Sequence, residues 1–530
     1  MTGGHVAGRG GRVLRGIIVQ ERRLPSNPIT RLALVLVASA AIGSAAAQPK
    51  PDHPERRPQQ QQQQAPSNEQ GVLRLLPADS VTEHGVDTAA GRIAYTATAG
   101  TLPFYDQSGD QSAAVFYTAY VAKDRGANRP LTFVFNGGPG AASAFLNLGL
   151  VGPRRLDLGP QARDAASAKL VDNPETWLAF TDLVLVDPIG TGWSRTVKPD
   201  AAKNFYSVRS DADSMAKAIA LYVSKTNRAE TPIYLFGESY GGFRAAKVAN
   251  ALKREQGINI SGIVMLSPLL EGWLTFGDDQ SALRAALELP SLAATHLENT
   301  NAFTPQALAA AEKFALGDYL TTLAGPPLQG EAARAFYQRV ANITGLPVDT
   351  VAQSRGFVTG NFVKTLHEGK VVSRYDATFA VDDPFPEQRG ARGPDPILDG
   401  VARAYGGAFA AYARNELGFK TEMTYNLLAG DISGHWDWGG SGRGDAGVDG
   451  DLRVLLSFSP KFRLLIGSGL SDLITPYAEA RYVLDHLPPT DPPGRAVLKT
   501  YRGGHMVYLD PQSRKAFTAD AAAFYKAGAR

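Results

Sequence analysis

Residues 234–248 read YLFGESYGGFRAAKV, and this stretch holds one serine, Ser239, between two glycines. The run PIYLF before the glycine is apolar and predicts a buried strand, and GGFRAAKVANALKRE after the serine predicts a helix. A serine on a sharp turn between strand and helix needs small residues two positions away on either side, and Gly237 and Gly241 meet that need. The stretch therefore predicts a nucleophilic serine on a strand–turn–helix, with an ordinary surface serine as the alternative.

The surroundings of this stretch predict an α/β fold. Further short apolar runs are bounded by turn residues and separated by helical patterns, which is typical of buried parallel strands. Residues 91–121 alternate instead like antiparallel strands. Polar or glycine-rich signatures follow the parallel runs, where open α/β sheets place their active sites. These runs and signatures are LTFVFNGGPG, TDLVLVDPIGTGWS, PIYLFGESYGG, GIVMLSP, KFRLLIGSGLSD and AVLKTYRGGH.

A nucleophilic serine needs a base, and the base needs an acid that orients it. In this kind of fold the three follow in the order Ser, Asp, His at the ends of later strands. Asp472 comes just past the run KFRLLIGSG, and His505 comes just past the next run. Their order and position favour them as acid and base. The other histidines considered, His367 and His435, lie in a region that we interpret as an insertion.

Composition excludes several classes of function. The formal net charge is only +3, and nothing in its distribution indicates nucleic acid as a partner. The chain has no cysteine, which excludes disulfides, a cysteine nucleophile and thiolate metal sites. No cofactor is needed for the predicted chemistry.

The N-terminal residues predict export from the cytoplasm. Basic residues precede an uncharged run from Leu32 of about fifteen residues, which is shorter than the roughly 20 residues of a membrane span. The run ends in small residues, so residues 1–47 are predicted to be a signal peptide that is cleaved after Ala47, with an uncleaved anchor as the alternative. Residues 48–70 are rich in Pro and Gln and predict a disordered linker. The mature protein is expected to be periplasmic or secreted and to have no stable membrane insertion.

The folded part is predicted to consist of a core in two pieces, residues 71–269 and 456–530, with a helical cap in residues 270–455. The predicted cap contains Ala-rich amphipathic runs at helical spacing. Trp436 and Trp438 are candidates for substrate contact or for core packing. Three acidic residues raise the question of a calcium site, but they lack the EF-hand spacing, and we predict no metal. These residues are Asp445, Asp449 and Asp451.

Four motifs together resemble the serine carboxypeptidase family. They are Asn136-Gly137-Gly138-Pro139-Gly140, Gly237-Glu238-Ser239-Tyr240-Gly241-Gly242, Asp472, and Gly504-His505-Met506-Val507. The resemblance implies an α/β-hydrolase fold, a mostly parallel sheet with an inserted helical cap, and a triad of Ser239, Asp472 and His505. It also implies an oxyanion hole from the backbone amides of Gly138 and Tyr240.

The resemblance further implies how the terminal carboxylate of a substrate is bound. Asn136 and Gly137 would donate hydrogen bonds to it, and Glu238 would do so as a neutral acid, since two carboxylates in contact cannot both stay ionised. The chain departs from the family's sequence pattern at two positions. Ala141 replaces the usual cysteine, and Leu150 stands where the family often has a second acid.

Because Leu150 leaves the carboxylate site without its second acid, we considered Arg154 and Arg155 as replacements, with surface positions as the alternative. The expected function is that of an exported serine-type carboxypeptidase acting on peptides with a free C-terminus. An esterase or acyltransferase with the same triad is the first alternative. A non-catalytic binding protein on the same fold is the second.

Overall fold

The computed structural model describes residues 71–123, 126, 128–159, 165–358, 360, 362–388 and 393–528. The predicted signal peptide, residues 1–47, and the predicted linker, residues 48–70, lie outside these residues. A search of the helices in the described ranges finds none that is long and apolar enough to cross a membrane.

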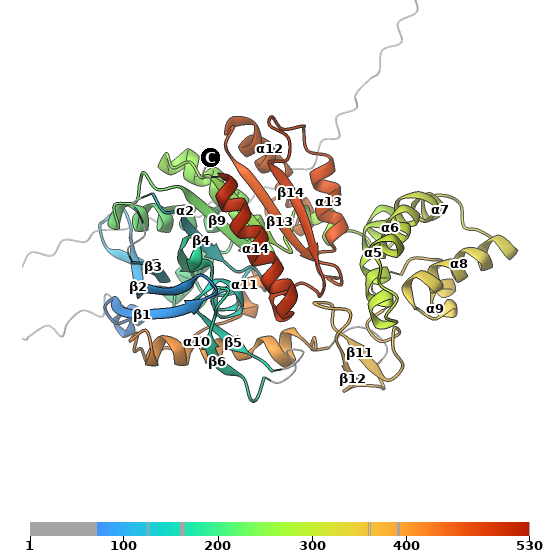
Figure 1. The fold of residues 1–530 in the computed structure, drawn as a ribbon, viewed down its shortest axis with the longest axis horizontal. Coiled ribbons are helices and arrows are strands. Elements are labelled where there is room, and N and C mark those ends of the chain that lie inside the picture. Colours follow the sequence, from blue (N-terminus) through green and yellow to red (C-terminus); the bar gives the residue numbers. More distant parts are fainter. Residues whose placement is uncertain are drawn as a thin grey trace, which may run out of the picture. The chain divides into compact units, whose positions relative to one another are not determined.

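A sheet of ten strands forms the centre of the fold (Figure 1). Its order is β1-β2-β3-β7-β4-β9-β10-β13-β14, and β8 pairs with β3. Strands β1, β2, β3 and β7 pair antiparallel, and from β7 to β14 every pairing is parallel. The sheet is therefore mostly parallel, as expected, with an antiparallel edge. The strands are β1 (Ser80–Thr88), β2 (Gly91–Tyr105), β3 (Gln111–Ala122), β4 (Leu131–Phe135), β7 (Asp182–Val186), β8 (Arg195–Thr196), β9 (Ile233–Glu238), β10 (Gly262–Leu266), β13 (Arg463–Gly469) and β14 (Ala496–Tyr501).

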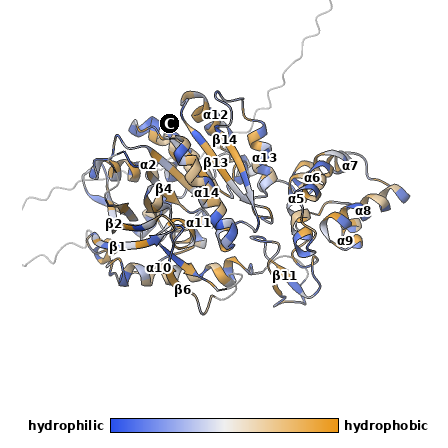
Figure 2. Ribbon diagram, viewed as in Figure 1, coloured by the Kyte–Doolittle hydropathy of each residue, from blue (hydrophilic) through white to orange (hydrophobic). Residues whose placement is uncertain are grey.

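The central strands are buried on both faces, which explains their continuous apolar runs (Figure 2). Alternate residues of each strand enter different cores, because successive side chains point to opposite faces. Phe133 belongs to one core with helices α2 (Val208–Lys225) and α3 (Tyr240–Ala251). Val134 belongs to the other core with α10 (Ala404–Asn415) and α14 (Pro511–Gly528).

Helices are the main secondary structure of the chain between β10 and β13. It also contains a hairpin of β11 (Lys370–Val372) and β12 (Ala380–Asp382) that the sequence did not predict. Side chains of α5, α6 and α8 share a separate core around Leu289, Phe314 and Phe336. The helices of this region are α4 (Gly272–Thr275), α5 (Ala282–Asn299), α6 (Pro305–Phe314), α7 (Leu320–Ala324), α8 (Gly330–Thr344), α9 (Val348–Gln353), α10, α11 (Gly430–Gly434) and α12 (Asp449–Phe458).

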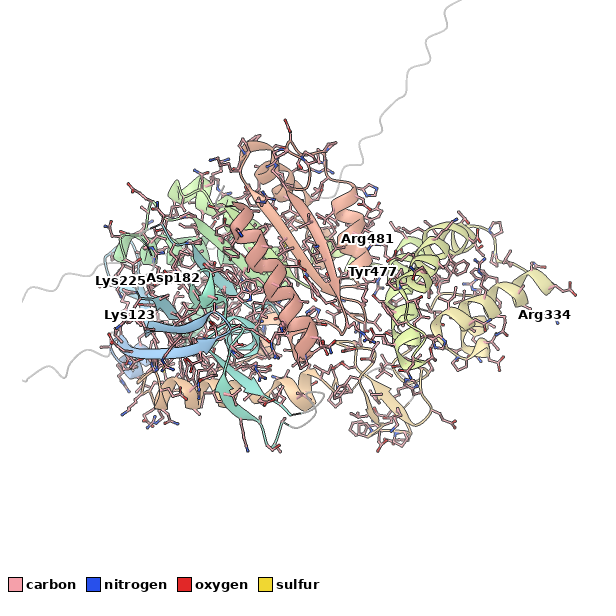
Figure 3. All side chains as sticks on the ribbon, viewed as in Figure 1. Lys123, Asp182, Lys225, Arg334, Tyr477 and Arg481 are labelled. Atoms are coloured by element: carbon pink, nitrogen blue, oxygen red, sulfur yellow. The ribbon has the colours of Figure 1, made fainter. Side chains whose placement is uncertain are left out.

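Helix α13 (Tyr477–Asp485) connects the separate helical core to the rest of the fold (Figure 3). Tyr477 donates a hydrogen bond of 2.6 Å to Glu312 on α6, and Arg481 lies 2.9 Å from the same carboxylate. The remaining short elements are β5 (Arg154–Asp157), which pairs with β6 (Lys169–Asp172), and α1 (Ala144–Leu146), which leads into a π-helical turn over Asn147–Val151.

Candidate active site

Ser239 occupies the sharp turn between β9 and α3. Its backbone has φ 61° and ψ −128°, a conformation that L-residues rarely adopt. Glycine is needed two positions before and two positions after Ser239, because other backbone atoms come very close at both places. A Cβ on Gly237 would lie 1.9 Å from the carbonyl oxygen of Gly241, and a Cβ on Gly241 would lie 2.5 Å from the carbonyl oxygen of Phe135. The glycine spacing in the sequence is thus explained by steric exclusion.

Asp472 and His505 follow β13 and β14, and the structure brings them together. The Nδ1 atom of His505 lies 2.8 Å from Oδ2 of Asp472, and both side chains are buried. Asp472 is itself held by hydrogen bonds from the backbone N–H groups of Ile474 and Thr475, at 2.8 Å and 3.1 Å, and from the Thr475 hydroxyl at 2.9 Å. A proton on Nδ1 facing the carboxylate leaves Nε2 as the basic nitrogen.

The electrostatic surroundings make the His505 ring more basic. Burial alone would lower the pKa of His505, but the neighbouring carboxylates of Asp472 and Glu238 raise it, and the net shift is upward. A raised pKa makes the imidazole a better proton acceptor, which is the property that a general base requires.

The hairpin β11–β12 is bonded to the loops that carry the acid and the base. The N–H of His505 donates to the carbonyl of Tyr375 at 2.6 Å, and the two rings pack edge to face with centroids 5.2 Å apart. On the acid side, Leu473 N–H donates to the carbonyl of Arg374, and Ala377 N–H donates to the carbonyl of Ser471, both at 3.0 Å. The hairpin therefore helps to fix the positions of both side chains.

Glu238 and Asn136 form a polar pair beside Ser239. The Nδ2 of Asn136 lies 3.2 Å from one carboxyl oxygen of Glu238, and the Tyr508 hydroxyl lies 3.4 Å from the other. Burial raises the pKa of Glu238 to about 7, and its contacts with His505, Tyr508 and Asn136 only partly offset the rise. A substantial fraction of Glu238 is therefore a neutral acid at pH 7, able to donate a hydrogen bond.

The two residues of the predicted oxyanion hole, Gly138 and Tyr240, line the same cavity as Ser239. Tyr240 is the first residue of α3, so its N–H has no acceptor within the helix. Gly138 has φ 102°, which favours glycine, and a Cβ on the neighbouring Gly137 would lie 2.6 Å from the Tyr240 nitrogen. The two strand ends thus approach so closely that only glycine fits between them.

Arg244 is a buried cation that the sequence analysis did not single out. Its Nε donates to Asp211 at 2.7 Å, its Nη1 donates to the carbonyl oxygen of Asn136, and its guanidinium lies 5.0 Å from the Tyr240 ring centroid. Arg244 therefore ties α2, the end of β4 and the start of α3 together. Sequence offers no signal for this role, because an arginine in an amphipathic helix usually faces solvent.

Ser239 and His505 line one cavity of about 150 Å³, together with the other candidate residues. The exception is Asp472, which is buried and contacts His505 without lining the cavity. We call this cavity the serine cavity. Its polar residues include Asn136 after β4, Glu238 and Ser239 at the end of β9, and His505 after β14. Its apolar wall contains Phe145, Leu269, Phe276 and Leu428. The candidate residues that line it are Asn136, Gly137, Gly138, Glu238, Ser239, Tyr240 and His505.

The two arginines considered for carboxylate binding do not line the serine cavity. Arg154 is bonded to Asp172 and lies 3.1 Å from Glu416, and Arg155 lies 3.7 Å from Asp157. The surface position is thus the interpretation that their contacts favour. Leu150 is fully buried in the second core.

Other residues discussed from the sequence also have local partners. Trp436 and Trp438 pack edge to face on the Tyr240 ring, at centroid distances of 5.3 Å and 5.4 Å, which favours core packing. His367 Nε2 lies 3.3 Å from Asn299, and His435 Nδ1 lies 2.8 Å from the carbonyl of Asp431. The three acidic residues contact different groups, Asp445 with Ser441, Asp449 with Arg453, and Asp451 with Lys247.

Comparisons with known proteins find similarity to serine carboxypeptidases. The family model of the serine carboxypeptidases matches residues 96–301. A retinoid-inducible serine carboxypeptidase of Rattus norvegicus is 32% identical over 166 residues, which cover 29% of this chain and 34% of that protein. The pheromone-processing carboxypeptidase kex1 of Schizosaccharomyces pombe is 32% identical over 145 residues, which cover 26% of this chain and 25% of that protein. The matches thus span about a third or less of these relatives.

A solved structure supports the same fold over a larger share of the chain. The crystal structure of Kex1(delta)p, a prohormone-processing carboxypeptidase from Saccharomyces cerevisiae, superposes with a TM-score of 0.53. The superposition covers 81% of this chain and 91% of that one, at 16% sequence identity. At that identity the likeness shows the α/β-hydrolase fold.

Proposed function

We propose that this chain, which is similar to the serine carboxypeptidases over residues 96–301, is a serine-type carboxypeptidase that removes C-terminal residues from peptides. The observation that supports this most is the composition of the serine cavity. It holds a serine and a carboxylate-bound histidine for acyl transfer, and beside them a buried acid–amide pair, Glu238 and Asn136, suited to a carboxylate.

In the proposed mechanism Ser239 is the nucleophile. Nε2 of His505 takes the proton from the hydroxyl, and Oγ attacks the carbonyl carbon of the last peptide bond. The backbone amides of Gly138 and Tyr240 stabilise the oxyanion. The C–N bond breaks as His505 returns the proton to the leaving amine, and water then hydrolyses the acyl-enzyme by the same proton transfers in reverse order. Asp472 orients His505 and stabilises its charged form.

Recognition of the free C-terminus is proposed for Asn136, Gly137 and Glu238. The amide of Asn136 and the N–H of Gly137 donate to the terminal carboxylate, and neutral Glu238 donates a third hydrogen bond. Because burial raises the pKa of Glu238 to about 7, this third donor is lost as the pH rises above that value. Substrate binding is therefore expected to weaken in alkaline solution.

The proposal extends to the regions around the site. Residues 71–269 and 456–530 form the hydrolase core, and residues 270–455 form the cap that covers the site. Residues 1–47 direct export and are removed, and residues 48–70 act as a tether, so that the enzyme works in the periplasm or outside the cell. Finding Gln48 as the N-terminus of the protein isolated from outside the cytoplasm would support export, and a cytoplasmic chain beginning at Met1 would contradict it.

The activity is tested by mass spectrometry of a peptide with a blocked N-terminus, incubated from pH 4 to 8 with the wild type and with Ser239→Ala. The same peptide as a C-terminal amide and a simple ester are run in parallel. Stepwise loss of C-terminal residues by the wild type alone is the expected result. An intact peptide would contradict a carboxypeptidase.

The same experiment separates the alternatives. Leu150, in place of the family's second acid, favours an esterase or acyltransferase, and cleavage of the ester together with an intact peptide would identify one. A non-catalytic binding protein would leave both substrates whole, and its Ser239 would not react with a fluorophosphonate.

A further inference from the structure

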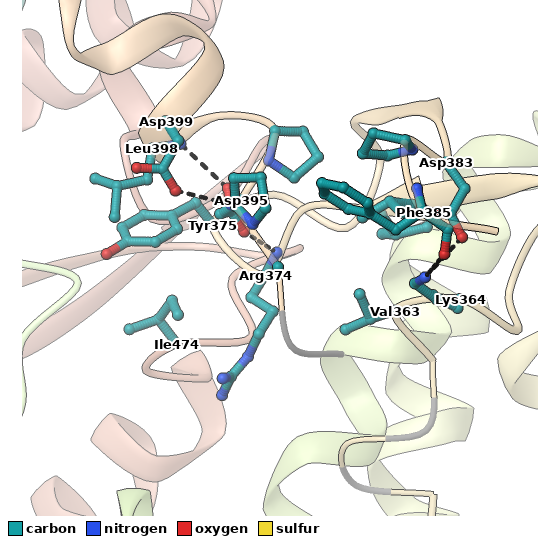
Figure 4. A pocket seen from close by; sticks show the side chains of 16 residues that line it. Val363, Lys364, Arg374, Tyr375, Asp383, Phe385, Asp395, Leu398, Asp399 and Ile474 are labelled. Atoms are coloured by element: carbon teal, nitrogen blue, oxygen red, sulfur yellow. Dashed lines mark hydrogen bonds and ion pairs between the residues drawn. The ribbon is translucent and has the colours of Figure 1, made fainter. Parts of the chain in front are cut away.

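A second cavity, of about 250 Å³, adjoins the serine cavity (Figure 4). Tyr375, Leu398 and Ile474 line both cavities. We call the second cavity the side chamber. Its walls contain apolar side chains, and the three shared residues place it next to the serine cavity. The apolar residues that line the side chamber away from the serine cavity include Val363, Val371, Val372 and Phe385.

Among the described residues, two cations line the side chamber, and one of them, Lys364, has its donors bound by the protein itself. Its Nζ lies 2.8 Å from the carboxylate of Asp383. It also donates to the carbonyl oxygens of Phe385 at 2.7 Å and Gln388 at 3.0 Å. Three contacts use the three protons of a lysine ammonium group, so Lys364 has none to offer a ligand.

Two carboxylates that line the side chamber also accept hydrogen bonds from the protein. Asp399 accepts hydrogen bonds from the N–H of Asp395 at 2.9 Å and from Arg403 at 3.1 Å. The carboxylate of Asp395 accepts four hydrogen bonds, three at Oδ1 and one at Oδ2. The donors are the Ser373 hydroxyl and the N–H groups of Arg374, Ile397 and Leu398.

Arg374 differs from these groups. Its backbone is fixed on both sides, because its N–H donates to Asp395 at 2.8 Å and its carbonyl accepts from Leu473 at 3.0 Å. Its side chain is exposed, and Figure 4 shows the guanidinium extending away from Asp395. Among the residues that the structure describes, no hydrogen bond or ion pair to this guanidinium is present. A positioned arginine with unused donors is suited to a carboxylate.

We propose that the side chamber binds an acidic side chain of the peptide substrate, with Arg374 receiving its carboxylate. The apolar side chains of the walls accommodate the methylene groups of a glutamate. The carboxylates of Asp395 and Asp399 already accept hydrogen bonds from the protein. This inference rests on the proposed function, since it names the class of peptide on which the same site acts. The acidic residue is either the last or the penultimate one of the substrate, and the experiment distinguishes the two.

The test compares kcat/KM for two series of blocked peptides. One series varies the last residue and the other varies the penultimate residue, each among Glu, Gln and Lys. In one series we expect the wild type to prefer Glu over Gln by about three- to fivefold, the ratio for one partly exposed ion pair. Arg374→Ala should remove this preference, and Arg374→Glu should change it to a preference for Lys.

Arg414→Ala is the matched control, because Arg414 is an exposed arginine that lines neither cavity and whose contacts are with Thr421 and Glu422. It should keep the Glu preference. Equal cleavage of all peptides, or a preference that survives Arg374→Ala, would overturn the side-chamber proposal and leave the carboxypeptidase proposal intact. If no peptide is cleaved, the proposed function fails. Calorimetry of the same peptides with Ser239→Ala then tests whether the side chamber binds an acidic side chain. Tighter binding of the Glu peptide supports the chamber, and equal binding overturns it.

Discussion

Replacing Glu238 by glutamine tests how the burial of this carboxyl group affects stability. The side chain is only 5% exposed, and burial raises its pKa from the ordinary value of 4.5 to about 7. Glutamine has nearly the same shape and can still contact Asn136 and Tyr508, but it does not titrate. The comparison of the two proteins therefore reports the charge at position 238, together with its effect on the pKa of the neighbouring His505.

The sign of the effect follows from proton linkage. Between pH 4.5 and pH 7 the folded chain binds more protons at Glu238 than the unfolded chain does. The contribution of this group to stability is therefore fully present below pH 4.5 and is lost as the pH rises through 7. The interval between these two values, at about 1.4 kcal/mol for each pH unit, corresponds to about 3 kcal/mol.

The assay is urea unfolding followed by tryptophan fluorescence at a series of pH values from 4.5 to 8.5. We expect the unfolding free energy of Glu238→Gln, relative to the wild type, to rise by about 3 kcal/mol across this range. Other buried acids with raised pKa values, Asp187, Asp376 and Glu479, titrate in both proteins and cancel in the difference. A difference that stays constant with pH would refute the reasoning.

For the blocked peptide, KM should rise above pH 7 in the wild type and stay flat in the Glu238→Gln variant.

Three further substitutions test the geometry of the site. Asp472→Asn should lower kcat by about a thousandfold or more while leaving the fold intact, because the His505 ring loses its orienting carboxylate; an unchanged kcat would contradict this role. Gly237→Ala should abolish soluble expression or fluorophosphonate labelling, because the new Cβ would lie 1.9 Å from a carbonyl oxygen. Asp211→Ala should destabilise the protein by about 3 kcal/mol in urea unfolding, since it leaves Arg244 as an unpaired buried cation, and a double variant with Arg244→Met should recover part of that loss.

The residues of the site that sequence reasoning found are those with a local signature. Ser239 stands between glycines whose spacing reflects a steric requirement, and Asp472 and His505 each follow an apolar run that can be read as a strand. The strand order then requires the ends of β9, β13 and β14 to lie along the same edge of the sheet. For that reason the structure places Asp472 in contact with His505, and Ser239 on the same cavity as His505.

The residues that sequence reasoning missed act through contacts between distant segments. Arg244 holds the carbonyl of Asn136, which lies 108 positions earlier, and the Tyr375 carbonyl holds the N–H of His505 from within the hairpin β11–β12. Neither contact leaves a pattern in the sequence, because each depends on how the segments pack. Arg154 and Arg155 were considered because they lie close to a motif in sequence. In the structure their side chains pair with acidic residues at the surface and do not line the serine cavity.

The contacts of the hairpin loop bear on how this region could be exchanged between related proteins. Three backbone hydrogen bonds join residues 374–377 to the loops that carry Asp472 and His505. A Cβ on Gly504 would lie 1.9 Å from the Tyr375 carbonyl oxygen, so the loop and the histidine segment fit each other at backbone level. A chimaera that replaces residues 270–455 as one cassette therefore also removes part of the scaffold of the base. A graft that stops before residue 373 and resumes after residue 377 keeps that scaffold and still brings in new helices.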